Sequence, residues 1–148
     1  SIGYFSQYSF ETLNPDYNVL EELRHRLPGE NDGTLRNILG AFLFRGDEVL
    51  KKVSVLSGGE KTRVILAAMF AQPHNCLVLD EPTNHLDIKS REILLEALKR
   101  YEGTLLFVSH DRFFLREITR RVFEVDHGKI SVYEGDYLYY LDKKKETM

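Results

Sequence analysis

The sequence predicts an α/β fold in which helices flank a parallel β-sheet. Short apolar runs end in polar residues at 76–79 and 104–108, as strands of a buried sheet do. Strand patterns alternate with helical patterns along the chain, which favours parallel strands joined by crossover helices. We therefore expect a parallel sheet flanked by helices, an inserted α-helical subdomain, and a C-terminal β-hairpin followed by a helix.

Composition bounds the class of protein. The chain has 148 residues, of which 43% are hydrophobic, enough for one domain with a real core. With 20 basic and 23 acidic residues, the net charge of −3 does not indicate nucleic-acid binding, although a local basic patch stays open. No apolar run reaches membrane-spanning length and no signal-peptide pattern is present, so we expect a cytoplasmic protein without a membrane partner.

The first half of the chain predicts one strand followed mainly by helices. Ile2–Ser6 is apolar and aromatic enough for a short strand that ends at Gln7. Turn residues follow at 14–18. Helical spacing of apolar residues then predicts helices over 19–27 and 34–43 and a short helical piece over 48–53.

The second half predicts the rest of the sheet. Residues 56–60, Leu-Ser-Gly-Gly-Glu, open a helix through about Gln72, which Pro73 ends. Strands are expected at 76–79 and 104–108, both buried on their two faces. The remaining elements are a helix over 88–101 capped by Asp87, a helix over 112–121, a hairpin of 122–125 with 130–133, and a helix over about 136–146.

Two adjacent carboxylates, Asp80 and Glu81, follow the strand at 76–79, and α/β sheets place their chemistry at this end of their strands. Asp80 is able to supply an oxygen ligand to Mg²⁺, while a second carboxylate is able to orient an attacking water. Adjacent acids suit two different roles because successive side chains on a strand point in opposite directions. The alternative is a buried strand that ends in a solvated acidic turn.

Ser57 to Glu60 fit a helix capping box, in which Ser57 and Glu60 satisfy each other's backbone N–H groups. Gly58 and Gly59 also allow backbone N–H groups to approach an anion closely at a helix N-terminus. Both interpretations hold together, because the cap would orient the donors that face a phosphate.

Three motifs occur in the order and spacing of an ATP-binding cassette (ABC) ATPase, and the chain resembles that superfamily over nearly its whole length. They are LSGGE at 56–60, CLVLDEPTNHLD at 76–87 and FVSHDRFFL at 107–115. The resemblance implies ATP and Mg²⁺ as cofactors and a second cassette as partner, whose bound ATP would present its γ-phosphate to the signature residues of this chain.

The resemblance also implies roles for single residues. Glu81 would be the catalytic base and His110 the γ-phosphate sensor, and a histidine merely paired with Asp111 is the alternative for His110. Asp80 and Gln7 would hold the metal. Nucleotide contacts would come from Gln7, Ser57, Gly58, Gly59, Glu60 and Asp87.

Within the superfamily, several residues are similar to the ABC-F group of ribosome-associated ATPases. The Asn84–Asp87 loop, the Glu60-Lys61 end of the signature, residues 39–56 and the tail 133–141 carry this similarity. It implies the C-terminal part of a second cassette in a protein that hydrolyses ATP to gate its binding to the ribosome, with its rRNA and tRNA. The alternative is the nucleotide-binding subunit of an ABC membrane transporter, and a third is an interaction module without catalysis.

The sequence holds no G-x-x-x-x-G-K-[ST] phosphate-binding loop, the Walker A motif. We therefore expect a partial cassette domain made of a Q-loop region (1–15), a helical subdomain with the signature (16–72) and a remainder with Walker B, D-loop, H-switch and hairpin (73–148). Alone it should hydrolyse ATP negligibly, and an exposed sheet edge with an apolar patch should favour self-association. Lys143–Lys145 is either a solvated helix end or an RNA contact.

Overall fold

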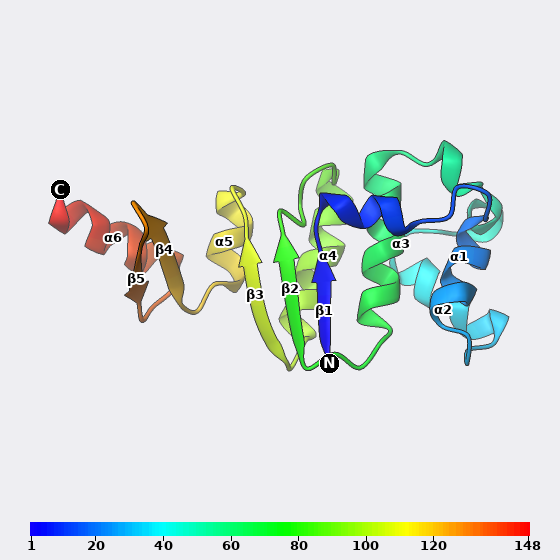
Figure 1. The fold of residues 1–148 in the computed structure, drawn as a ribbon, viewed down its shortest axis with the longest axis horizontal. Helices are drawn as coiled ribbons and strands as arrows, with labels where there is room; N and C mark the ends of the chain where they lie inside the picture. The colour runs from blue at the N-terminus through cyan, green and yellow to red at the C-terminus, as the bar shows by residue number, and fades with distance from the viewer. The chain divides into compact units, whose positions relative to one another are not determined.

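The computed structural model describes residues 1–148, which form two compact units, Ser1–Val108 and Ser109–Met148 (Figure 1). The first unit contains β1 (Ile2–Phe5), η1 (Gln7–Thr12), α1 (Val19–Arg26), α2 (Asp32–Ala41), η2 (Gly46–Leu50), η3 (Val53–Val55), α3 (Gly58–Phe70), β2 (Cys76–Asp80), α4 (Ile88–Arg100) and β3 (Thr104–Val108). The second contains α5 (Arg112–Ile118), β4 (Val122–Asp126), β5 (Lys129–Tyr133) and α6 (Tyr137–Thr147).

The sheet of the first unit confirms the predicted α/β class. Its order is β1-β2-β3, and β2 pairs in parallel with both neighbours. The register places Leu77 beside Gly3 and Leu105, so these residues share one face of the sheet. Helix α3 contacts both β1 and α4, and Figure 1 shows α4 behind the strands. Parallel strands therefore run toward one common edge, beyond which their polar C-terminal residues lie.

The prediction that both strands are buried on two faces is wrong. Leu77 and Leu79 are buried against the helices, but the opposite face of the sheet is open. Tyr4 is 59% exposed and Leu106 is 53% exposed, and the register places them on this open face with Val78 between them. The strands read as continuous apolar runs, yet only one face has helices packed on it. The expected apolar patch is therefore present as an open sheet face.

Helices fill the segment between β1 and β2, as predicted. Asn18 caps α1 and Asn31 caps α2, each by accepting a backbone N–H, so α2 starts two residues earlier than its apolar spacing suggested. The short helical piece expected over 48–53 is instead two separate 3-10 turns, η2 and η3. Helix α1 contacts α2, η2 and α3, which makes these elements one packed group around Leu23, Leu35 and Leu39.

The second unit is a helix followed by the predicted β-hairpin and terminal helix. Strands β4 and β5 are antiparallel, and their two-residue turn, His127-Gly128, has positive φ at both positions, as a type I′ turn requires. The Glu124 carboxylate holds α6 to the hairpin by accepting hydrogen bonds from the side chains of Tyr133, Tyr140 and Lys144. Helix α5 ends at Ile118, three residues before the predicted boundary.

Candidate functional site

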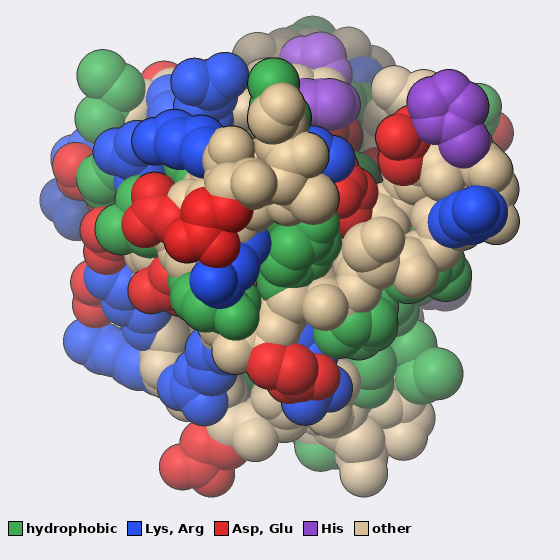
Figure 2. All heavy atoms as spheres, turned by 90° about the vertical axis from the view of Figure 1, so that its left-hand side faces the viewer, with side chains coloured by type: hydrophobic (Ala, Val, Ile, Leu, Met, Phe, Trp, Pro, Cys, Tyr) green, Lys and Arg blue, Asp and Glu red, His purple; other side chains and the backbone are tan.

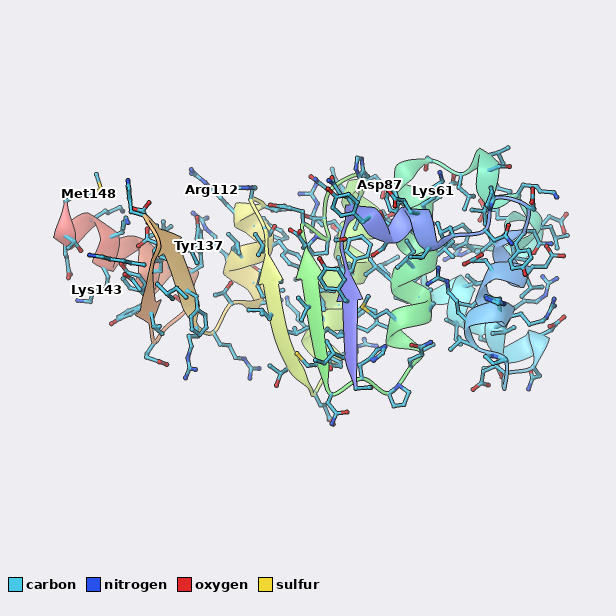
Figure 3. The ribbon with its side chains drawn as sticks, in the orientation of Figure 1. Lys61, Asp87, Arg112, Tyr137, Lys143 and Met148 are labelled. Atoms are coloured by element: carbon cyan, nitrogen blue, oxygen red, sulfur yellow. The ribbon has the colours of Figure 1, made fainter.

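A cleft of about 200 Å³ opens at the C-terminal edge of the sheet in the first unit. It is lined by Phe5, Gln7, Phe10, Thr62, Asp80, Glu81, Asn84 and His85. In Figure 3, the labelled Lys61 and Asp87 lie near this edge, beyond the arrowheads of β1 and β2. The structure thus brings Gln7, Asp80 and Glu81 together around one cavity, although they come from separate parts of the sequence.

Asp80 and Glu81 reach the cleft because β2 ends there. Asp80 is the last residue of the strand and is exposed, while Glu81 is half-buried. The Glu81 backbone N–H donates to the Val108 carbonyl at 2.8 Å, which continues the ladder between β2 and β3 by one residue. Glu81 has a φ of 49°, in the left-handed region that costs a non-glycine residue free energy. The chain turns sharply at Glu81, and the two carboxylates consequently occupy different environments.

Gln7 lies at the corresponding end of β1. Ser6, which is buried, caps η1 by accepting the Tyr8 N–H, and the Ser9 hydroxyl in turn accepts the Ser6 N–H at 3.0 Å. This reciprocal cap turns the chain immediately after the strand. Gln7 is thereby exposed at the cleft with an amide that offers both an acceptor oxygen and donor N–H groups.

The signature segment forms the predicted capping box at the start of α3. The Ser57 hydroxyl accepts the Glu60 N–H at 3.2 Å, and the Glu60 carboxylate accepts the Ser57 N–H at 2.9 Å. The second carboxylate oxygen of Glu60 accepts a hydrogen bond from Lys51 at 2.7 Å. Burial acts to raise the pKa of the Glu60 carboxyl, but the bonds from Lys51 and Ser57 outweigh it and leave the pKa below its usual range.

His85 connects η1 with the start of α3, and the sequence analysis did not identify it as a site residue. Its ring lies 6.0 Å from the Phe10 ring, centroid to centroid, and against Gly58, while its carbonyl faces Gly59. Its φ of 65° is a second left-handed conformation in the same loop as Glu81. Its position only four residues after Glu81, in the same motif, was the signal that could have indicated a place in the cleft.

Asp87 and His110 occupy element boundaries outside this cleft lining. Asp87 caps α4 as predicted, accepting the Ser90 N–H at 2.8 Å, and the hydrogen bonds from Ser90 lower the pKa of its carboxyl. His110 belongs to the second unit, between β3 and α5, where the following Asp111 caps α5 through the Phe114 N–H. Residues 1–148 contain no cluster of three or more His, Cys, Asp or Glu side chains arranged to hold a metal ion.

Comparison with known proteins assigns the chain to a family. A sequence model described as "ABC transporter" matches residues 1–84, more than half of the chain. The chain therefore belongs to the ABC transporter family and carries an ABC-type ATPase domain region. The resemblance to ABC ATPases that the signature and the two acids indicated is therefore confirmed for the family as a whole.

Relatives match over the full length of the chain. It is 51% identical over 148 residues to the putative ATP-binding protein YdiF of Bacillus subtilis (strain 168), covering 100% of this chain and 23% of that protein. It is 46% identical over 145 residues to ABC transporter F family member 5 of Arabidopsis thaliana, covering 98% of this chain and 21% of the relative. The chain thus spans less than a quarter of the length of these relatives.

Among solved structures, the chain is similar to one titled as a dimeric post-hydrolysis state of the ATP-binding cassette MJ0796 bound to ADP and Pi. The TM-score is 0.73 at 25% identity, covering 90% of this chain and 62% of that one. This likeness confirms the α/β cassette fold. No helix in residues 1–148 combines the length and apolar character needed to cross a membrane.

Proposed function

We propose that residues 1–148 supply the signature, Walker B and H-switch part of a second cassette in an ABC-F ATPase, which hydrolyses ATP to gate its binding to the ribosome. The observation that carries the proposal is the cleft in which Gln7, Asp80 and Glu81 meet, with the signature helix beside it. The relatives named ABC transporter F family members 5 and 2, which match 98% of the chain, support the ABC-F group.

The donor set of the cleft fits Mg²⁺. Asp80 offers a carboxylate and Gln7 an amide oxygen, both exposed at the cavity, and Mg²⁺ commonly takes one or two protein oxygens together with phosphates and water. When held by these residues, Mg²⁺ would supply positive charge that offsets the charge of the phosphates. Glu81, half-buried beside Asp80, accepts a hydrogen bond from the attacking water and orients it.

The signature segment completes a site on a second cassette. Ser57 caps α3, and Gly58 and Gly59 begin its first turn, whose free N–H groups and dipole favour an anion. Gly58 and Gly59 have no side chains to block a phosphate. In this proposal Ser57, Gly58 and Gly59 contact the γ-phosphate of ATP held by the other cassette. Asp87 borders the junction between the two cassettes, and His110 senses the γ-phosphate of the ATP bound to its own cassette.

The charges of the second unit do not favour Lys143–Lys145 as the RNA contact. Lys143 pairs with Glu146 at 2.8 Å, Lys144 pairs with Glu124, and Lys145 lies 3.9 Å from Asp142. On the face drawn in Figure 2, acidic side chains stand among the Lys and Arg side chains. This supports a solvated helix end. The proposed ribosome contact, and the cytoplasmic location that follows from it, rest on the resemblance of the chain to the ABC-F group.

The test is Glu81→Gln in the native protein that carries this chain. Glutamine keeps the shape of the side chain but removes the charge that orients water, so ATP should bind and remain unhydrolysed. We expect turnover to fall by about 10²- to 10⁴-fold, the usual contribution of a general base. We also expect the variant to sediment with ribosomes when ATP is present and to remain in the supernatant without it.

Glu102→Gln is the matched control, because Glu102 is exposed in the turn before β3 and should leave turnover unchanged. Failure to sediment with ribosomes in the presence of ATP, in a variant that binds ATP, would contradict the ribosome part of the proposal. It would direct attention to the alternative, a membrane partner that contacts the helices between β1 and α3.

A further inference from the structure

Lys51 connects the helices of the first unit to the signature segment. It follows η2, and its backbone carbonyl accepts the Val19 N–H at 3.0 Å, which fixes it to the start of α1. Its ammonium group donates to Glu60 at 2.7 Å, and the side chain remains 42% exposed. Glu60 uses its other oxygen for the Ser57 N–H, so one carboxylate joins Lys51 to the cap of α3.

Glu60 creates a conflict at this helix end. A carboxylate in the first turn stabilises the helix, yet the same negative charge repels any anion that approaches the N–H groups of Gly58 and Gly59. Lys51 is the cation that the structure places on this carboxylate. Exposed ion pairs contribute little to folding stability. Here the pair instead has an electrostatic effect: the ammonium group of Lys51 offsets the negative charge of Glu60 beside the glycines, where the anion would lie.

We infer that Lys51 is a positioning residue for the signature segment: it orients Glu60 and cancels its charge, so that Ser57, Gly58 and Gly59 can receive the γ-phosphate of ATP. This inference rests on the proposed function, in which that phosphate belongs to ATP on the other cassette. Lys51 itself need not touch the nucleotide. Its effect should therefore be specific for ATP over ADP, which has no γ-phosphate.

The experiment replaces Lys51 by methionine in the native protein that carries this chain. We expect the KM for ATP to rise roughly three- to tenfold, from the uncompensated charge of Glu60 near the phosphate. The dissociation constant for ADP and the melting temperature should remain those of the wild type. Adding Glu60→Gln to Lys51→Met should restore the KM, because the amide retains the acceptor for the Ser57 N–H and carries no charge.

Lys52→Met is the matched control. Lys52 is the adjacent lysine, but its ammonium group donates to the Asp16 carbonyl at 2.9 Å and not to the signature segment. Its replacement should leave the KM unchanged, and so should Lys51→Arg, which keeps the charge. An equal rise in Lys52→Met, a rise in Lys51→Arg, equal weakening of ADP, or an unchanged KM in Lys51→Met would each overturn the inference while the proposed function stands. A wild-type protein that neither binds nor hydrolyses ATP would overturn both.

Discussion

Gly59, in the first turn of α3, lies in close contact with the backbone of the loop that holds His85. A Cβ atom on Gly59 would lie 2.6 Å from the His85 carbonyl oxygen, a backbone atom that has no freedom to rotate away. Any side chain would therefore push the His85 loop away from α3. The glycine that the signature motif provides thus serves packing within this chain as well as the proposed phosphate contact.

We expect Gly59→Ala to destabilise the first unit by about 1–3 kcal/mol, the usual cost of forcing a methyl group into a packed site. Urea unfolding of residues 1–148 measures this. Gly29→Ala is the control, because a Cβ there meets no atom within 4 Å, and it should be neutral. Equal urea midpoints of unfolding for the two variants would contradict this prediction, because they would show that the His85 loop moves away from the added methyl group without loss of stability.

At the scale of elements, the helices of the site depend on their caps. Asp87 caps α4 through the Ser90 N–H, and its pKa is lowered first by the side-chain hydrogen bond from Ser90 and then by the backbone one. A lowered pKa in the folded state means that the cap stabilises the fold above the pKa of the unfolded chain, about 3.9. This contribution is lost as the pH falls through the lower folded pKa.

Asp87→Ala should therefore cost about 1 kcal/mol near neutral pH, and the difference from the wild type should shrink as the pH falls below about 4. Asp87→Asn should keep most of the cap, since its amide oxygen also accepts the Ser90 N–H. Unfolding free energies of residues 1–148 measured across this range check both statements. A cost that does not change with pH would mean that the ionised carboxylate is not the cap.

At the scale of the whole molecule, the open face of the sheet is the feature with the clearest consequence. Ile2, Tyr4, Leu106 and Val108 are each more than half exposed on this face. A contiguous apolar sheet face, with an unpaired edge on each side, favours association. Residues 1–148 should therefore associate as their concentration rises.

Leu106→Lys should reduce this association, because it places a charge on the open face, where Leu106 is 53% exposed. Light scattering over a range of concentrations measures the effect. Ile88→Lys is the matched control, since Ile88 is 72% exposed but lies on α4, outside the sheet. A wild-type chain that stays monomeric at every concentration would contradict the prediction.

Local signals explain why much of the fold was predictable. Capping residues such as Ser57 and Asp87, and the proline at position 73, act on their own neighbours, so their effects can be read directly from the sequence. The two 3-10 turns around Lys51 were not predicted, because long-range backbone contacts determine them. The Val53 N–H donates to the Tyr17 carbonyl, and the backbone of Lys52 forms an antiparallel β-bridge with that of Asn18.

The sequence by itself determined the alternation of strands and helices, the order of the motifs and the presence of two acids at a strand end, since each depends on residues close together in the chain. Only the tertiary structure decided that Gln7 meets Asp80 and Glu81, and that His85 lies against the signature glycines. It also decided that Lys51 pairs with Glu60 and that one face of the sheet stays open. The physical reason is that these features involve residues far apart along the chain. Such residues come together only when the parallel strands pair and the helices pack on the sheet.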